Sequence, residues 1–74
     1  MPDRVVKTIV HPAVDLRVDI YERDNGTFGF EELKYAEEEN AWHPTGRYSY
    51  AIMDTAETAE QEARGRVQWL GSAR

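Results

Sequence analysis

The chain alternates strictly between apolar and polar residues along residues 14–20, and the segment continues to Arg23. Successive side chains of an extended chain point to opposite faces, so the alternation predicts a β-strand over residues 14–23 with one apolar face. The residues of that face are Val14, Leu16, Val18 and Ile20. The turn Asp24-Asn25-Gly26 follows at once, and its residues accept the positive φ of a tight hairpin. The pattern therefore predicts a β-hairpin.

Further strands are expected on both sides of this turn. Four apolar residues suggest a short strand over Arg4–Val10, after which His11-Pro12 bends the chain. The return strand begins with Phe28 and Phe30 on one face, but Leu33 and Tyr35 then occur at the opposite parity. Either a bulge resets the register before Leu33, or the strand carries these two residues on its second face. We favour a bulge, or a sheet whose outer face is partly covered.

The middle of the chain is less regular. Residues 37–46 have no hydrophobic period and end in turn residues, which predicts a loop. A third strand is expected over Arg47–Met53, with Tyr48, Tyr50 and Ile52 on one face.

A helix is predicted to close the domain. Asp54 followed three residues later by Glu57 is a capping-box arrangement, so Asp54 is the expected N-cap. Apolar residues then recur at spacings of three and four, at Ala56, Ala59, Ala63, Val67 and Leu70. Gly65 either admits a close neighbour or weakens the helix, and Gly71 is expected to end it.

These elements predict an α+β fold: an antiparallel three-stranded meander, with a short fourth N-terminal strand as an option, and one C-terminal helix packed on one face. The apolar face of residues 14–20 should meet Ala59, Ala63, Val67 and Leu70. At 74 residues the chain has room for one domain over 1–74, with short flexible ends near 1–4 and 71–74.

Composition narrows the function classes. Fourteen acidic against nine basic residues give a net charge of −5, which disfavours nucleic acid and acidic membranes and attracts basic partners. No cysteine is present, and no stretch approaches the roughly 20 apolar residues of a membrane span or resembles a signal peptide. We therefore expect a cytoplasmic protein that does not enter a membrane.

The sequence offers no catalytic constellation. The glutamates at 31, 32, 37, 38 and 39 form a run that is expected to be solvated, and it lacks the spacing of a calcium loop. His11 and His43 both precede proline but belong to no zinc-binding spacing. Neither Ser49 nor Ser72 lies in a nucleophile motif. We expect no enzyme activity, no cofactor and no metal.

Aromatic residues raise one alternative. Trp42 and Tyr48, with Tyr21 and Tyr35, could form an exposed aromatic surface beside Arg17, Arg23 and Arg47 that stacks single-stranded nucleic acid on the sheet. The carboxylates of residues 15 and 19, expected on the same face, argue against this alternative because they would repel a phosphate backbone.

The order strand, Asp-Asn-Gly turn, aromatic strand, Trp-containing loop, strand and Ala-rich helix resembles small bacterial β-β-β-α domains of uncharacterised function. The segment Asp54-Thr55-Ala56-Glu57-Thr58-Ala59 is similar to the helix start of HicB-type antitoxins, and Asp24-Asn25-Gly26 and Phe28-Gly29-Phe30 have counterparts in their hairpin. That resemblance implies an acidic protein that neutralises a small basic ribonuclease. The chain departs from it in the Glu-rich, Trp-bearing insertion and in having no appended DNA-binding segment.

The leading hypothesis is a non-catalytic interaction domain that binds an unknown protein partner or forms a homodimer through the open face or edge of its sheet. Four residues are expected to form the interaction surface: Tyr21, Leu33, Tyr35 and Trp42.

Overall fold

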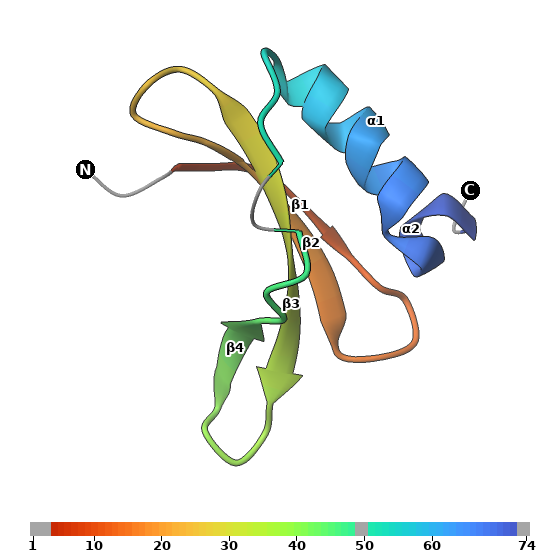
Figure 1. Cartoon of the computed structure of the whole chain (residues 1–74). Helices are drawn as coiled ribbons and strands as arrows, with labels where there is room; N and C mark the ends of the chain where they lie inside the picture. The colour runs from red at the N-terminus through yellow and green to blue at the C-terminus, as the bar shows by residue number, and fades with distance from the viewer. Residues whose placement is uncertain (1–3, 49–50, 73–74) are drawn as a thin grey trace.

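A computed structural model describes residues 4–48 and 51–72 and shows a four-stranded antiparallel sheet with helices on one side (Figure 1). Its strands follow one another in space as in sequence, in the order β1-β2-β3-β4. Strand β1 spans Arg4–Val10, β2 Leu16–Glu22, β3 Phe28–Ala36 and β4 Ala41–Pro44. The helices are α1, Ala56–Arg66, and α2, Gln68–Ser72. The predicted α+β class, the antiparallel meander and the C-terminal helix are thus confirmed.

The number and identity of the strands differ from the prediction. The optional strand β1 is present, and the predicted loop contains β4. A turn over residues 37–40 brings β4 back onto β3, and Asn40 takes a φ of 54° there, a conformation that asparagine tolerates better than most residues. No strand forms in the described part of Arg47–Met53; only Met53 makes an isolated bridge, to Phe28. Tyr50, predicted on that strand, lies outside the described residues.

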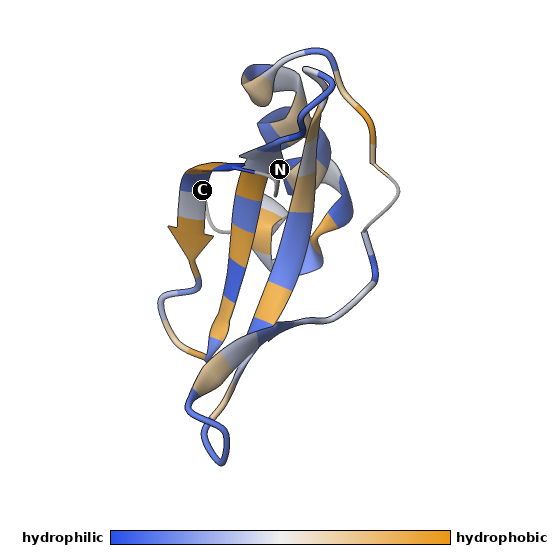
Figure 2. Ribbon diagram, turned by 90° about the vertical axis from the view of Figure 1, so that its left-hand side faces the viewer, coloured by the Kyte–Doolittle hydropathy of each residue, from blue (hydrophilic) through white to orange (hydrophobic). Residues whose placement is uncertain are grey.

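The register of β2 and β3 is continuous from Leu16↔Lys34 to Glu22↔Phe28. Leu33 and Tyr35 therefore lie on the second face of the sheet, and the favoured bulge between Glu31 and Leu33 is wrong. An irregularity occurs in β1 instead, between Val5 and Lys7. Figure 2 shows the resulting alternation of hydrophobic and hydrophilic residues along the long strands.

The core lies between α1, α2 and the sheet. Val18 and Ile20 of β2 and Phe30 of β3 pack there against four helical residues, Ala59, Ala63, Val67 and Leu70. This packing confirms two of the four residues predicted on the apolar face of the strand, Val18 and Ile20. Val14, however, is 52% exposed, and Leu16 lies half-buried outside the cluster. The strand begins only at Leu16, because residues 12–15 form a bend that carries Val14 away from the helices.

Helix α1 begins one residue later than expected. Thr55 is the N-cap, and its Oγ1 accepts a hydrogen bond of 3.1 Å from the backbone N–H of Thr58. The prediction of Asp54 as N-cap is therefore wrong. Both residue types can cap a helix, and here it is the threonine hydroxyl that lies within hydrogen-bond distance of a free N–H of the first turn.

The expected single helix is interrupted at Val67, where the backbone becomes extended before α2 begins. Gly71 does not end α1 but lies within α2, and a Cβ placed on it would stand 2.7 Å from the carbonyl oxygen of Arg64. The glycine thus permits α2 to fold back on α1. Gly65 has open space around it, so it admits no close neighbour.

Of the ends predicted to be flexible, Arg4 lies in β1, and Gly71 and Ser72 lie in α2; residues 1–3 and 73–74 fall outside the described part. Within residues 4–48 and 51–72, no helix is long and apolar enough to cross a membrane.

Candidate interaction surfaces

The sheet face opposite the helices carries all four residues of the predicted interaction surface, but two of them are already covered. Tyr21 and Leu33 are buried within the single chain, at 9% and 8% exposure. Tyr35 and Trp42 are half-buried and face each other edge-on, with ring centroids 5.4 Å apart. The sheet face predicted to bind a partner is therefore largely covered by side chains of the chain itself.

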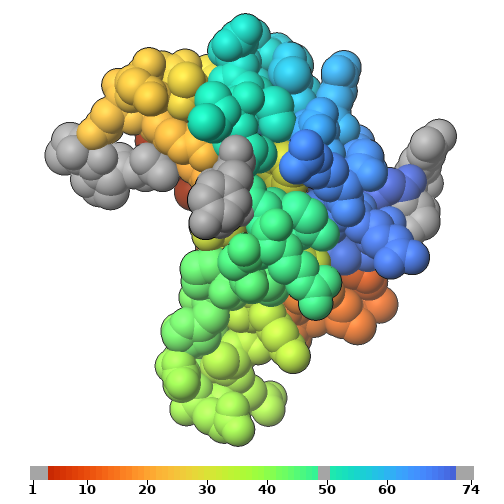
Figure 3. All heavy atoms as spheres, viewed as in Figure 1, coloured from red at the N-terminus to blue at the C-terminus, as the bar shows by residue number. Residues whose placement is uncertain are grey.

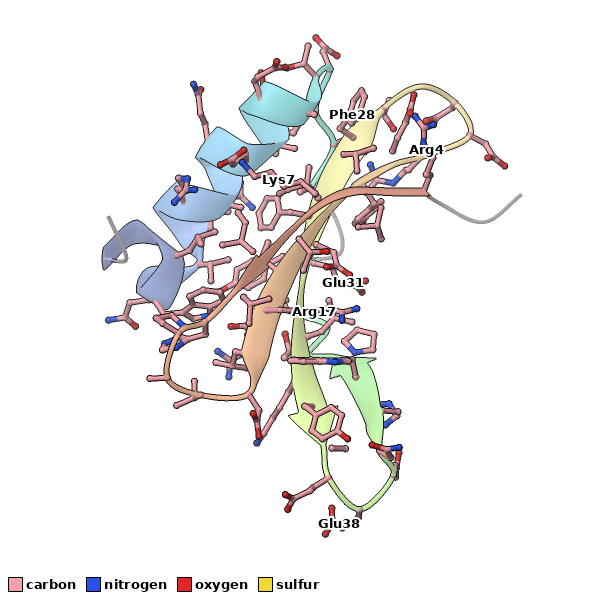
Figure 4. All side chains as sticks on the ribbon, turned by 180° about the vertical axis from the view of Figure 1, so that it is seen from behind. Arg4, Lys7, Arg17, Phe28, Glu31 and Glu38 are labelled. Carbon is pink, nitrogen blue, oxygen red and sulfur yellow. The ribbon has the colours of Figure 1, made fainter. Side chains whose placement is uncertain are left out.

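Arg17 covers the part of this face around Leu33 and Trp42. Its guanidinium lies 4.7 Å from the ring centroid of Trp42 and donates a hydrogen bond of 3.2 Å to Asp19. Because β3 separates β2 from β4, the Arg17 side chain must cross β3 at Leu33, its partner in the register. Asp19 also accepts a bond of 2.8 Å from Thr8 of β1, so the polar contacts continue to the edge of the sheet. Figure 4 shows this face, with Arg17 and Glu31 labelled.

Arg23 covers the end of this face next to the β2–β3 turn. It lies 4.9 Å from the ring centroid of Tyr21 and donates hydrogen bonds to the Tyr21 hydroxyl, at 2.9 Å, and to the backbone carbonyls of Phe28 and Ala51, at 3.2 and 2.8 Å. Gly29 makes room for it, since a Cβ there would stand 2.7 Å from the Arg23 guanidinium. The arginine thereby fastens the segment before α1 to the β2–β3 hairpin.

The residues of the nucleic-acid alternative do not form one surface. Arg17 is engaged with Asp19 and Trp42, and Arg23 with backbone carbonyls. Arg47 lines hollows beside Leu16 and Glu32, whose positions in the strand register belong to the helix side of the sheet.

Exposed apolar surface gathers instead on β1, at an edge of the sheet. Val5, Val6 and Val10 are exposed, whereas Tyr35 and Trp42 are not fully so. In the described part of the chain, β1 pairs only with β2, and no strand lies along its other side. The run Val-Val-Lys-Thr-Ile-Val carried this signal in the sequence, but its lack of strict alternation hid which side chains would face solvent.

The remaining charged side chains near β1 are largely neutralised. Lys7 donates hydrogen bonds to both carboxylate oxygens of Glu60 in α1, at 2.9 and 3.1 Å, and Arg64 approaches Glu60 from the same helix. Hydrogen bonding by Lys7, and then by Arg64, lowers the pKa of Glu60. Arg4 pairs with Glu22 at the far end of the strand. The edge thus carries little net charge of its own.

The glutamate run divides into two environments. Residues 37–39 are exposed, as the sequence predicted. Glu32 is not solvated: it is 6% exposed and accepts hydrogen bonds of 2.8 Å from the indole N–H of Trp69 and 3.1 Å from the hydroxyl of Thr45. Trp69 lies 37 residues away in the sequence, so no local sequence pattern could indicate its hydrogen bond to Glu32.

The two histidines serve local structure. The Nδ1 atom of His11 accepts from the backbone N–H groups of Ala13 and Val14, at 3.0 and 3.3 Å, and its ring lies against Trp69. His43 of β4 contacts Glu39. Among the residues that the structure describes, no three His, Cys, Asp or Glu side chains gather as metal ligands.

Comparison with known proteins found no match for this chain among family models, curated proteins or solved structures. The resemblances to β-β-β-α domains and HicB-type antitoxins stay predictions.

Proposed function

We propose that this chain is a non-catalytic interaction domain that self-associates by pairing β1 with β1 of a second copy. The observation that carries the proposal is the open edge of the sheet, with exposed valines along it. Extended segments add to such edges through backbone hydrogen bonds, and side chains along the edge select the partner.

The backbone of β1 has the correct phase for this pairing. The N–H of His11 donates to the carbonyl of Leu16 at 2.9 Å, which makes this a hydrogen-bonded pair. Antiparallel partners alternate between hydrogen-bonded and non-hydrogen-bonded positions, so Ile9 and Lys7 bond to β2. The polar backbone groups of Thr8 and Val10 are then directed toward the open side.

A two-fold axis at Thr8, perpendicular to the sheet, uses these groups symmetrically. It places Thr8 opposite Thr8 of the second copy and Lys7 opposite Ile9, so the two lysines do not face each other. It also brings each Val10 to the bulged end of the other strand, next to Val6. Two four-stranded sheets would then join into one, with the helices of both copies on the same face.

Lysines and bulges usually protect edge strands from such pairing. Here the ammonium of Lys7 is engaged with Glu60, on the side of β1 that faces α1 (Figure 4). The bulge lies between Val5 and Lys7, which leaves the stretch from Lys7 to Val10 regular. The short regular stretch and the modest area of a strand edge favour a weak dimer with a Kd in the micromolar range.

Sedimentation velocity across a concentration series tests the proposal with two matched variants. Val10→Lys adds a charge where the second copy would pair, and it should shift the chain to the monomer. Val14→Lys is the control, because Val14 has similar exposure, 52% against 60%, and lies outside the strand. Val10→Pro removes an outward N–H while sparing the bonds to β2, and it should act like Val10→Lys.

A wild-type chain that sediments as a monomer at every concentration would overturn self-association. So would a dimer that Val10→Lys and Val10→Pro leave intact, because its interface would then lie elsewhere. Circular dichroism of each variant confirms that the fold is retained.

A further inference from the structure

A hollow of about 440 Å³ opens on the helix side of the sheet, where the β3–β4 hairpin extends beyond the helices. The loop before β2, the middle of β3 and the segment after β4 line it. These three segments, orange, yellow-green and green, come together in the space-filling view (Figure 3). This region is separate from the proposed dimer edge at β1.

Two basic residues in this hollow stand out by their lack of partners. Lys34 and Arg47 both line it, and neither makes an ion pair or hydrogen bond to a residue that the structure describes. Every other lysine or arginine within the described ranges bonds a protein group. Arg66, for example, is held by Glu62, and Arg23 by two backbone carbonyls. The two uncommitted cations therefore converge on one concavity.

Two carboxylates share the same hollow. Glu32 is 94% buried by its 6% exposure, and Trp69 and Thr45 fix its orientation through their hydrogen bonds. A carboxylate offers about four acceptor positions, so these two bonds leave further capacity. Asp15 lies at the exposed rim, and its carboxylate has no partner among the described residues. The lining thus balances two positive charges against two negative ones.

The four charged side chains that line the hollow indicate which class of ligand would fit it. If Lys34 and Arg47 served only to neutralise Glu32 and Asp15, direct ion pairs would be expected, as Lys7 and Arg64 form with Glu60. An anion alone would meet the two carboxylates, and a cation alone would meet the two basic groups. A ligand that carries both charges satisfies all four side chains.

We propose that this hollow binds a small zwitterion of the α-amino-acid class with an apolar or aromatic side chain. The ligand's carboxylate lies against Arg47 and Lys34, and its ammonium donates to Glu32, whose position the Trp69 indole holds. Val14 and Leu16 provide apolar walls for the side chain. The volume lies within the range of small-molecule sites, about 300–1,000 Å³.

Titration of the ¹⁵N-labelled full chain, followed by NMR, tests the site with L-leucine and L-phenylalanine as probes. Saturable shifts are expected at the amides of Leu16, Glu32 and Tyr35. Arg47→Gln and Lys34→Gln change exposed side chains and should each raise the Kd about tenfold or more, as the loss of a charged hydrogen bond implies. Arg64→Gln is the control, since this exposed arginine pairs with Glu60 outside the hollow.

Propionate and butylamine provide single-charge probes in the same titration. Both should bind at least tenfold more weakly than the amino acids, because each leaves one pair of charges unsatisfied. Absence of saturable shifts with either amino acid at millimolar concentration would overturn the proposal. Equal binding of a single-charge probe, or unchanged affinity in both hollow variants, would overturn it as well.

Discussion

The hydrogen bond between Trp69 and Glu32 should be a measurable part of the stability of this small domain. It joins α2 to β3 at 2.8 Å, and its acceptor is a carboxylate that is 6% exposed. A hydrogen bond to a charged group contributes about 1.5–3 kcal/mol, because the group left without its partner must stay desolvated. Trp69→Phe removes the N–H donor while keeping an aromatic ring beside His11.

The loss of this hydrogen bond is large relative to the total free energy of unfolding. At roughly 0.05–0.15 kcal/mol per residue, a chain of 74 residues has a free energy of unfolding of about 4–11 kcal/mol. A loss of about 2 kcal/mol lowers the Tm of a domain of this size by about 8–16 °C. Thermal and urea unfolding, followed by circular dichroism, would measure the change.

A double-mutant cycle separates the bond from the lost packing. Glu32→Leu, Trp69→Phe and the double variant should give a coupling energy of about 1.5–3 kcal/mol. The same cycle on the exposed pair Glu62 and Arg66, with alanine at each position, is the control and should give about 0.5 kcal/mol or less. If the free-energy changes of the two single variants at positions 32 and 69 add to that of the double within about 0.5 kcal/mol, the reasoning is refuted.

Three further changes test other parts of the fold. Gly65→Ala should raise the free energy of unfolding by about 0.5–1 kcal/mol in urea titration, because α1 has open space there; a destabilised variant would show a hidden contact. Gly29→Ala should cost about 1–3 kcal/mol by the same assay, because its Cβ would stand 2.7 Å from Arg23, while an unchanged midpoint would show that the arginine moves freely. Lys7 lowers the pKa of Glu60, so the stability from this carboxylate is complete above the ordinary glutamate pKa and is lost as pH falls through the lowered pKa. Glu60→Gln should flatten that acid limb of the stability profile, and a profile of unchanged slope would contradict the assignment.

The amino-acid sequence specified the elements that depend only on neighbouring residues. Alternation over residues 16–22 specified β2, and Asp24-Asn25-Gly26 specified the hairpin turn. The spacing of alanines specified the face of α1 that meets the sheet. These signals depend on neighbours within a few residues, so they could be recognised without knowing the fold.

Residues whose environment comes from distant segments could be assigned only from the folded chain. Glu32 looked like part of a solvated run until Trp69 and Thr45 were placed beside it. Leu33 looked like a free apolar surface until the Arg17 side chain crossed β3 to reach Trp42. A strand pattern states which face a side chain takes, but long-range contacts decide what covers that face. The candidate interaction surfaces are therefore the β1 edge and the charged hollow, and not the aromatic face.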